Sequence, residues 1–318
     1  MKKNMVNESR VEGYLYSYDL NAAVTGKESK TPNTEYIRGT INIATDDKMT
    51  NIVPVYFMFV TKNTKAGKVN STYNILNDIL NKRLKSVMDF GAEEASKLSI
   101  NSNIGYLREF YDLRQNPPQL ITEKGNVGGF IKVVSTLSEE EKVRNVFKTD
   151  MVITSAIRRE SEDDDTPEKM TIKGVIFNFR NDILPVEYSV LNPAAMDYFE
   201  DLEISSKNPV FTKVWGHQIS ETVVTKKVEE TAFGEEYVQE STRSHKDFVI
   251  TGAIREPYAW DDESTITAEE LKEKMAERET YLATVRSRQE DYQKNKDKNS
   301  VKAEATHKVE VEDGDFDF

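Results

Sequence analysis

The residues best suited to binding chemistry gather in the last part of the sequence. Residues 309–318 hold five acidic side chains and two phenylalanines. Carboxylates at this density repel one another, and the segment has no apolar face wide enough to offset the entropy lost on ordering. The two aromatic rings are therefore left in water, where a basic pocket with an apolar floor on another protein could bind them. The alternative is a tail that only raises solubility. The residues expected to bind such a partner are Asp313, Asp315, Phe316, Asp317 and Phe318.

This acidic tip resembles the tails of single-stranded-DNA-binding proteins from bacteria and their phages. Those tails end in several Asp residues followed by a terminal Phe, and they recruit replication and repair enzymes. The resemblance implies that enzymes of this kind dock on Phe316 and Phe318.

Residues that could perform catalysis are sparse. The only histidines are His217, His245 and His307, and they lie in separate segments. The sequence has no Walker-type phosphate loop, no zinc-ligand spacing and no nucleophile elbow. The cluster Asp163–Asp165 lacks the alternating ligands and the glycine of a calcium loop, which favours a solvated loop over a cation site. We therefore expect that the protein is not an enzyme and that it binds no cofactor and no metal.

The charge of the chain is distributed unevenly. Its formal net charge is −12, which by itself argues against binding nucleic acid. Residues 1–120 nevertheless hold 16 Lys and Arg against 13 Asp and Glu, a net charge of +3, so the remaining 198 residues carry −15. An acidic protein can still present a basic groove, and this distribution permits one.

Several classes of protein are excluded by composition. The sequence has no cysteine, which excludes disulfides and thiolate metal sites and fits a reducing cytoplasm, that of a bacterial host if the protein is phage-encoded. It also has no apolar run of 18 residues and no apolar signal-peptide core near Met1, so we expect no membrane association.

Apolar patterning predicts strands over most of residues 10–60 and 128–255. Residues 52–60 form a nearly continuous apolar run, which is typical of a strand buried on both faces. Residues 71–88 place an apolar stripe at helical spacing, and Gly91 is expected to end that helix.

The second half of the chain repeats features of the first. Ile37-Arg38-Gly39 recurs as Ile172-Lys173-Gly174 within a similar strand pattern. Residues 150–158 and 247–255 agree at seven of nine positions. We expect each of these two segments to close a domain, and the first could also open the second domain.

These repeats predict two related domains followed by a polar extension. The alternative is two unrelated β-domains with chance similarity. The capping box Thr267-Ala-Glu-Glu270 begins a helix with a thin apolar stripe, which favours a solvated linker. The expected boundaries are 1–160 and 161–260 for the domains, 220–246 for a long hairpin inserted near Phe233, 265–294 for the polar helix and 295–318 for a disordered tail.

Each half contains three strands, a helix and further strands, which is the order of the OB-fold. The expected fold class is therefore mainly β, with two tandem OB-like barrels, inserted helices, a long hairpin, a C-terminal polar helix and a disordered acidic tail. This order resembles that of phage single-stranded-DNA-binding proteins. Together with the tip, it implies sequence-independent binding of single-stranded DNA in phage DNA replication or recombination.

A ligand of that kind needs aromatic faces on which its bases stack, and Lys or Arg along its backbone. Trp215 is the best candidate for stacking, because Lys213 and His217 share its face by period-two alternation. The residues expected to contact DNA are Tyr14, Tyr16, Tyr36, Arg38, Lys62, Lys65, Lys68, Lys173, Arg180, Lys213 and Trp215.

Not every aromatic residue in these strands is expected to face the ligand. Alternation in residues 11–18 places Tyr14, Tyr16 and Tyr18 on one face. A phenylalanine in a strand more often belongs to the core, which is the expectation for Phe177, Phe179 and Phe211.

A different class of function stays open. Tandem β-barrels with a long hairpin and a tail would also suit a structural or assembly protein of a virion. The two functions differ in their response to salt, because a strand-binding protein releases DNA as the salt concentration rises.

Overall fold

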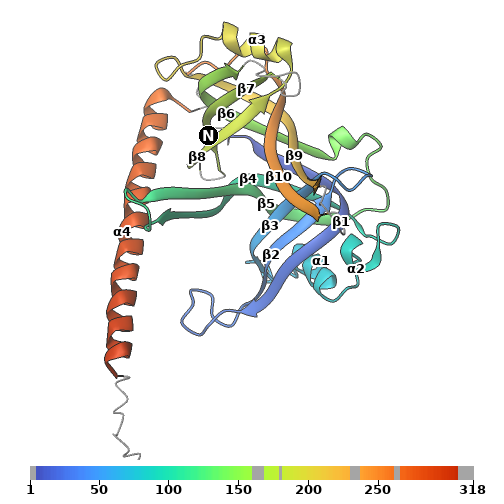
Figure 1. The fold of residues 1–318 in the computed structure, drawn as a ribbon, viewed down its shortest axis with the longest axis vertical. Helices are drawn as coiled ribbons and strands as arrows, with labels where there is room; N and C mark the ends of the chain where they lie inside the picture. The colour runs from blue at the N-terminus through green and yellow to red at the C-terminus, as the bar shows by residue number, and fades with distance from the viewer. Residues whose placement is uncertain (1–4, 160–167, 179–180, 230–236, 261–265, 307–318) are drawn as a thin grey trace, which may run out of the picture.

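The fold is mainly β, as the sequence patterns predicted, and its strands join into one ten-stranded sheet among the residues described. In this sheet each half of the chain is curled into a barrel (Figure 1). The computed structural model describes residues 5–159, 168–178, 181–229, 237–260 and 266–306, with the backbone alone described for 221–229, 237–245 and 295–306.

The first barrel closes on itself through its first strand. Its neighbouring strands follow the order β1-β2-β3-β5-β4-β1, in which β3 and β5 are parallel and the other pairs antiparallel. This is a five-stranded Greek-key barrel of the OB type. Its strands are β1 (Asn7–Val24), β2 (Glu35–Ala44), β3 (Ile52–Thr61), β4 (Lys97–Asp112) and β5 (Gln119–Val133).

Two short helices, rather than one, connect β3 to β4. α1 (Ser71–Leu80) begins at Asn70, whose side chain accepts a hydrogen bond from the Thr72 amide, and α2 (Val87–Phe90) ends at Gly91. The expectation of a single helix over residues 71–88 is therefore wrong. The chain leaves the helical path after Leu80, where Lys82 takes a positive φ of 56°. Buried Leu76 and Ile79 still fix α1 to the first core.

The second barrel repeats the order of the first. Its strands follow the order β6-β7-β8-β10-β9-β6, with β8 and β10 parallel. A helix, α3 (Pro193–Asp201), stands between its third and fourth strands, as α1 does in the first barrel. The strands are β6 (Asn145–Arg159), β7 (Lys169–Phe177), β8 (Ile183–Val190), β9 (Val210–Glu229) and β10 (Tyr237–Ala253).

The repeated glycine has the same physical role in both barrels. It lies on the second strand, where the backbone of the first strand passes very close. A Cβ on Gly39 would come within 2.0 Å of the Asp19 carbonyl oxygen, and one on Gly174 within 2.1 Å of the Val152 carbonyl oxygen. Gly39 also has a φ of 133°, which side chains disfavour. The shared Ile-basic-Gly pattern therefore marks equivalent positions, at which the second strand of each barrel lies very close to the first.

The division between the barrels differs from the one expected at residue 160. β6 ends at Arg159, and it pairs with β7 and β9, so it belongs to the second barrel. Residues 150–158 open this barrel, while residues 247–255 begin within its last strand. We therefore propose that the two domains divide in residues 134–144, which contain the short helix η1 (Glu141–Val143).

A buried polar network joins the two barrels where β1 pairs with β6. The side chains of Asn126 and Gln218 form a reciprocal amide pair, with hydrogen bonds of 2.7 and 2.9 Å. Ser9 bonds to both of them, at 2.9 Å to Asn126 and 2.8 Å to Gln218. All three residues are at least 95% buried. Because they come from β1, β5 and β9, the network fixes one barrel against the other.

Two long hairpins extend beyond the barrels. The first is the end of the β4–β5 pair, residues 105–125, called the arm below. The second is the β9–β10 pair, which runs from Val214↔Ala253 to Glu229↔Tyr237 with one register shift between Ile250 and Gly252. The turn expected around Phe233 lies outside the described residues.

The C-terminal helix α4 (Ala268–Thr306) is longer than the expected 265–294, and helix replaces the disorder expected from residue 295 up to Thr306. It is also not a solvated linker. Leu271 packs into an apolar cluster on the second barrel, and the arm reaches across to the helix (Figure 1). There, Arg278 lies 2.6 Å from Glu109, and Gln289 accepts a hydrogen bond of 2.7 Å from the Tyr111 amide.

Candidate nucleic-acid interface

An aromatic pair with one exposed ring lies on the outer face of β2 and β3. The rings of Tyr36 and Phe59 are 4.5 Å apart between centroids and tilted by 38°. Phe59 is 47% exposed and its neighbour Met58 is 53% exposed. We call Tyr36, Arg38, Met58 and Phe59 the aromatic face.

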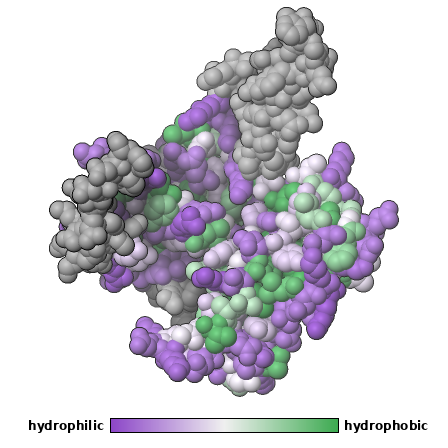
Figure 2. Space-filling model, turned by 60° about the horizontal axis from the view of Figure 1, so that its bottom comes forward, coloured by the Kyte–Doolittle hydropathy of each residue, from purple (hydrophilic) through white to green (hydrophobic). Residues whose placement is uncertain are grey.

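A β-bulge creates this face. Ile37 pairs with Val60, but Gly39 pairs with Phe57, so Met58 and Phe59 together oppose Arg38. The extra residue breaks the alternation of β3, and two consecutive apolar side chains reach the surface. The expectation that residues 52–60 are buried on both faces is therefore wrong at this end of the strand. Figure 2, seen from the first-barrel end of the molecule, shows apolar residues exposed in several patches.

Unpaired positive charge lies on and near the aromatic face. Arg38 is exposed on β2, and Lys65 and Lys68 are exposed in the loop that follows β3. None of the three makes an ion pair with a residue that the structure describes. Lys62 differs, because its amine lies 2.9 Å from the Glu35 carboxylate, whose hydrogen bond and charge raise the pKa of Lys62.

The tyrosines of β1 do not share one face as expected. Leu15 pairs with Ile43 and Ser17 with Asn42, so Tyr16 is the extra residue of a bulge. Tyr18 consequently packs against the first core, while Tyr14 lies under the Lys97 amine at 5.7 Å from its ring centroid. Tyr14 and Tyr16 are predicted to contact DNA, but no contact among the described residues joins either of them to the aromatic face.

A groove continues from β2 and β3 between the bases of the two hairpins. It encloses about 320 Å³. Thr40, Pro54 and Tyr56 of the first barrel line it, together with Lys124 of the arm and Lys246 of β10. The first barrel thus has a path along its outer face that leads from the Tyr36–Phe59 pair into a groove.

Lys124 is the most unusual cation of this groove. Burial lowers its pKa below the ordinary value of 10.5, and the nearby Arg278 charge lowers it further. Glu109 and Glu187 act in the opposite direction but do not outweigh these effects. No carboxylate among the described residues forms an ion pair with Lys124. A partly buried and unpaired amine would be stabilised by an anion in the groove.

The second barrel does not offer an equivalent face. Its outward residues Val175, Phe177 and Ile183 on β7 and β8 are buried, at 8%, 0% and 5% exposure. The chain itself covers them, because Ile266 and Leu271 join the same apolar cluster, with Tyr258 and Trp260 packed against it. The position that is open in the first barrel is filled here by the segment that leads into α4.

Phe211 shows how closely this cover is packed. Its ring lies 6.3 Å from Phe177, 4.9 Å from Tyr258 and 5.8 Å from Trp260, between centroids. The expectation that Phe177 and Phe211 belong to the core is confirmed, since both are at most 1% exposed. Phe179 lies outside the described residues.

The lysines predicted to contact DNA on the second barrel lie close to carboxylates of the chain. Lys213 is only 14% exposed, lies 3.6 Å from Asp150 and sits over the Tyr258 ring at 5.8 Å. Burial lowers the pKa of Lys213, but Tyr258 and Asp150 outweigh it and raise this pKa overall. Lys173 is exposed and lies 3.3 Å from Glu187. Lys213 therefore has a structural role, and we leave it out of the proposed site.

Trp215 is 38% exposed on β9. Its indole lies so close to Gly252 of β10 that a Cβ there would come within 2.4 Å of the ring. His217, predicted on the same face, has its Nδ1 3.2 Å from the Asn145 carbonyl oxygen. Trp215 is thus a partly exposed ring on the second barrel. In the described part of the chain its strand, β9, does not pair with β2 or β3, which hold the aromatic face.

Some predicted residues cannot be placed. Arg180 and the tip residues Asp313, Asp315, Phe316, Asp317 and Phe318 lie outside the described residues. Within the described part of the chain, no group of three His, Cys, Asp or Glu side chains could hold a metal ion. No helix in that part combines the length and apolar character needed to cross a membrane.

Sequence reasoning missed Met58, Phe59, Tyr56 and Lys124. The available indication for the first two was Gly39, since a glycine inside a strand often marks a bulge. Lys124 had no local indication, because its surroundings come from the arm, α4 and the second barrel.

Comparisons with known proteins give a family and distant likenesses to solved structures. No curated protein matches the chain. A solved structure of a deletion mutant of the single-stranded DNA binding protein from Thermus aquaticus is 10% identical, with a TM-score of 0.46, over 80% of this chain and 97% of that one. The assignment of both barrels to the OB type rests on their strand pairings and not on this likeness. The model of the YorF family matches residues 6–306, and the chain therefore belongs to the YorF family.

Proposed function

We infer that this protein binds single-stranded DNA without strong sequence preference, and that the aromatic face of the first barrel is its central contact. The observation that carries this proposal is the Tyr36–Phe59 pair, in which Phe59 is exposed and Tyr36 partly exposed, beside an unpaired Arg38 on the outer face of β2 and β3. OB-folds bind oligonucleotides on the face of these two strands.

The chemistry of the aromatic face suits a single strand rather than a duplex. Unpaired bases can stack on Tyr36 and Phe59, and each stacked base contributes about 1–3 kcal/mol. Arg38, Lys65 and Lys68 can contact the phosphates that connect those bases. Since every base has a flat face and every nucleotide a phosphate, such binding depends little on sequence.

The groove supports a continuation of the same path. Its walls come from the arm and the β9–β10 hairpin, and Lys124 offers a partly desolvated positive charge to a phosphate. The covered face of the second barrel supports an unequal division of roles. In this proposal the first barrel binds the strand, while the second barrel holds α4 and one wall of the groove.

The finer role proposed for the protein is in phage DNA replication or recombination, in the cytoplasm of a bacterial host. The acidic tip that ends in Phe316 and Phe318 would recruit partner enzymes, held away from the barrels by α4. The protein would have no catalytic activity of its own. The acidic composition of the tip and its two phenylalanines support this part of the proposal.

The test compares matched variants in a binding assay. Fluorescence anisotropy with a labelled oligo-dT measures the affinity of the full chain and of Phe59→Ala. Loss of one stacked base predicts a Kd raised by about 5- to 150-fold. Phe90→Ala is the control, because Phe90 is 38% exposed but lies on α2. Equal affinities of the two variants would contradict the assignment of the aromatic face.

The rival function is tested by the same experiment. A structural or assembly protein of a virion would bind no oligo-dT at any salt concentration and would form defined oligomers, which sedimentation measures. That result would overturn the proposal as a whole.

A further inference from the structure

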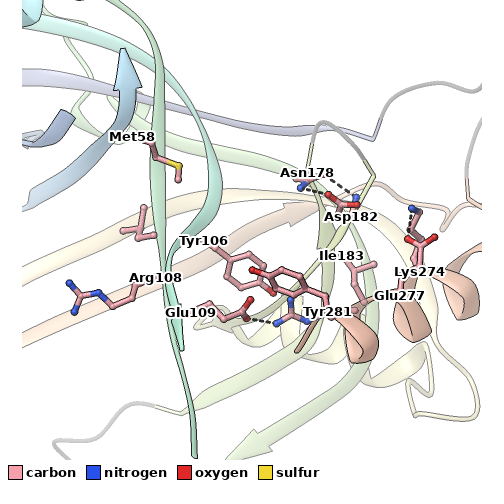
Figure 3. A pocket seen from close by; sticks show the side chains of 12 residues that line it. Met58, Tyr106, Arg108, Glu109, Asn178, Asp182, Ile183, Lys274, Glu277 and Tyr281 are labelled. Atoms are coloured by element: carbon pink, nitrogen blue, oxygen red, sulfur yellow. Dashed lines mark hydrogen bonds and ion pairs between the residues drawn. The ribbon is translucent and has the colours of Figure 1, made fainter. Parts of the chain in front are cut away.

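A second cavity lies where four parts of the molecule meet, and the site described above does not include it. It encloses about 610 Å³, the size of a small-molecule pocket. Met58 lines it from the first barrel, Arg108 from the arm, Ile183 from the second barrel and Tyr281 from α4. Figure 3 shows this cavity with its lining side chains.

The arm and α4 are fastened to each other at one wall of the cavity. Glu109 and Arg278 form an ion pair of 2.6 Å, with side chains only 6% and 13% exposed. The Arg278 guanidinium also lies 4.8 Å from the centre of the Tyr106 ring. Charges so well shielded and paired hold the arm to the helix in one arrangement. The cavity is therefore a built feature of the fold rather than a gap between loose elements.

Most of the charge that lines the cavity is already neutralised. Lys274 lies 2.7 Å from Glu277, and Glu109 is held by Arg278. Asp182 keeps its negative charge, although it accepts a hydrogen bond of 3.0 Å from the Asn178 side-chain amide. Such a lining favours a neutral, flat and partly apolar ligand over a phosphate.

One lining cation is not neutralised. Arg108 is exposed and forms no ion pair with a residue that the structure describes. In Figure 3, Arg108 and Met58 lie on one side of the arm, and Tyr106 and Tyr281 lie on the other. The cavity thus connects a surface with a free positive charge to a space with two aromatic rings.

The cavity is continuous with the aromatic face through Met58. This residue is the direct neighbour of Phe59 in β3 and also lines the cavity. A strand that leaves the Tyr36–Phe59 pair and moves along Met58 would reach Arg108 next. The ring of Tyr281, 54% exposed, is available beyond the arm.

We propose that this cavity is a second nucleotide subsite, in which one unstacked base of the bound strand packs against Tyr281 while Arg108 contacts the adjacent phosphate. This inference rests on the proposed function and deepens it, since it defines where the strand runs after the aromatic face. The arm and α4 together act as the far wall of the binding path.

The subsite has a consequence for oligonucleotide length. Oligonucleotides of about four nucleotides can occupy the aromatic face alone, whereas those of about sixteen can reach the cavity as well, within the range of site sizes known for OB-folds. Tyr281→Ala should leave the Kd for the short oligonucleotide unchanged. It should raise the Kd for the long one by about 5- to 150-fold, the effect of one lost base stack.

Tyr292→Ala is the matched control. Tyr292 lies on the same helix, is 71% exposed and does not line this cavity. Both side chains are exposed, so both variants should keep the melting temperature of the unchanged chain. An equal Kd of Tyr281→Ala and Tyr292→Ala for the long oligonucleotide would overturn the subsite.

Photocrosslinking provides a second, independent measurement. A long oligo-dT that carries 5-iodouracil at single positions is irradiated with the full chain, and the crosslinked peptide is identified by mass spectrometry. The expected product is a crosslink at Tyr281 from a position distinct from those that crosslink to Tyr36 or Phe59. Crosslinks at the aromatic face alone would overturn the subsite and leave the proposed function standing. Absence of binding by any oligonucleotide would instead refute the proposed function, and the subsite with it.

Discussion

Replacing Gln218 by leucine tests how the two barrels are held together. The change keeps a side chain of similar length and removes three hydrogen bonds, one accepted from Asn126 and two donated to Asn126 and Ser9. The backbone carbonyl of Gln218, which accepts from the Asn51 side chain at 3.1 Å, is not affected.

The expected loss follows from what the partners retain. Asn126 still donates to the Pro54 carbonyl at 3.2 Å and still accepts from Ser9 at 2.9 Å, so no polar group is left without a partner. Three hydrogen bonds at about 0.5–1.5 kcal/mol each amount to about 1.5–4.5 kcal/mol. Leucine regains part of this by burying apolar surface, and we expect a net destabilisation of about 1–3 kcal/mol.

Thermal unfolding followed by circular dichroism measures this effect. At about 2–4 °C per kcal/mol for a chain of this size class, Gln218→Leu should lower the Tm by about 2–12 °C. Gln115→Leu at the exposed end of the arm is the control and should leave the Tm nearly unchanged. An unchanged or raised Tm for Gln218→Leu would refute the reasoning that this network fixes the barrels.

Three further predictions concern charge. The affinity for single-stranded DNA should fall as the pH rises through the pKa of Lys124, which is lowered below the ordinary 10.5, because only the protonated amine attracts a phosphate. Anisotropy titrations across alkaline pH should show this fall in the unchanged chain and not in Lys124→Arg. Glu109→Gln leaves the Arg278 charge buried without its partner, which destabilises the fold by about 3–5 kcal/mol. Hydrogen exchange should then become faster in the arm and in the adjoining turns of α4. Unchanged exchange would contradict the conclusion that this pair holds the arm to the helix. Deleting residues 309–318 should tighten DNA binding at low salt if the acidic tip competes for the basic path, and an unchanged Kd would exclude that competition.

The sequence predicts the architecture well where the pattern is local. The helix between the third and fourth strands of each barrel, the mainly β class and the buried Phe177 and Phe211 follow from periodicity and from the repeated Ile-basic-Gly. That repeat is informative because Gly39 and Gly174 meet the same steric demand, the close backbone of a neighbouring strand.

Features that depend on pairing between distant strands were not predictable. The bulges at Tyr16 and at Met58–Phe59 reverse the side chains that alternation assigns, and the bulge at Met58–Phe59 creates the aromatic face. β6 belongs to the second barrel because it pairs with β9, which begins more than fifty residues later in the chain. The docking of α4 depends on the Glu109–Arg278 pair, whose residues are 169 positions apart.

The measurement that tests the central claim most directly is an anisotropy titration of a labelled oligo-dT of about thirty nucleotides at several salt concentrations. Three unpaired cations near the aromatic face, Arg38, Lys65 and Lys68, predict tight binding whose log K falls with log salt at a slope of at least about −2, at about −0.7 for each phosphate contact. The further contacts of Lys124 and Arg108 would bring this slope to about −3.5. A duplex of equal length should compete poorly. No binding at low salt, by the full chain or by one that lacks residues 309–318, would contradict the account.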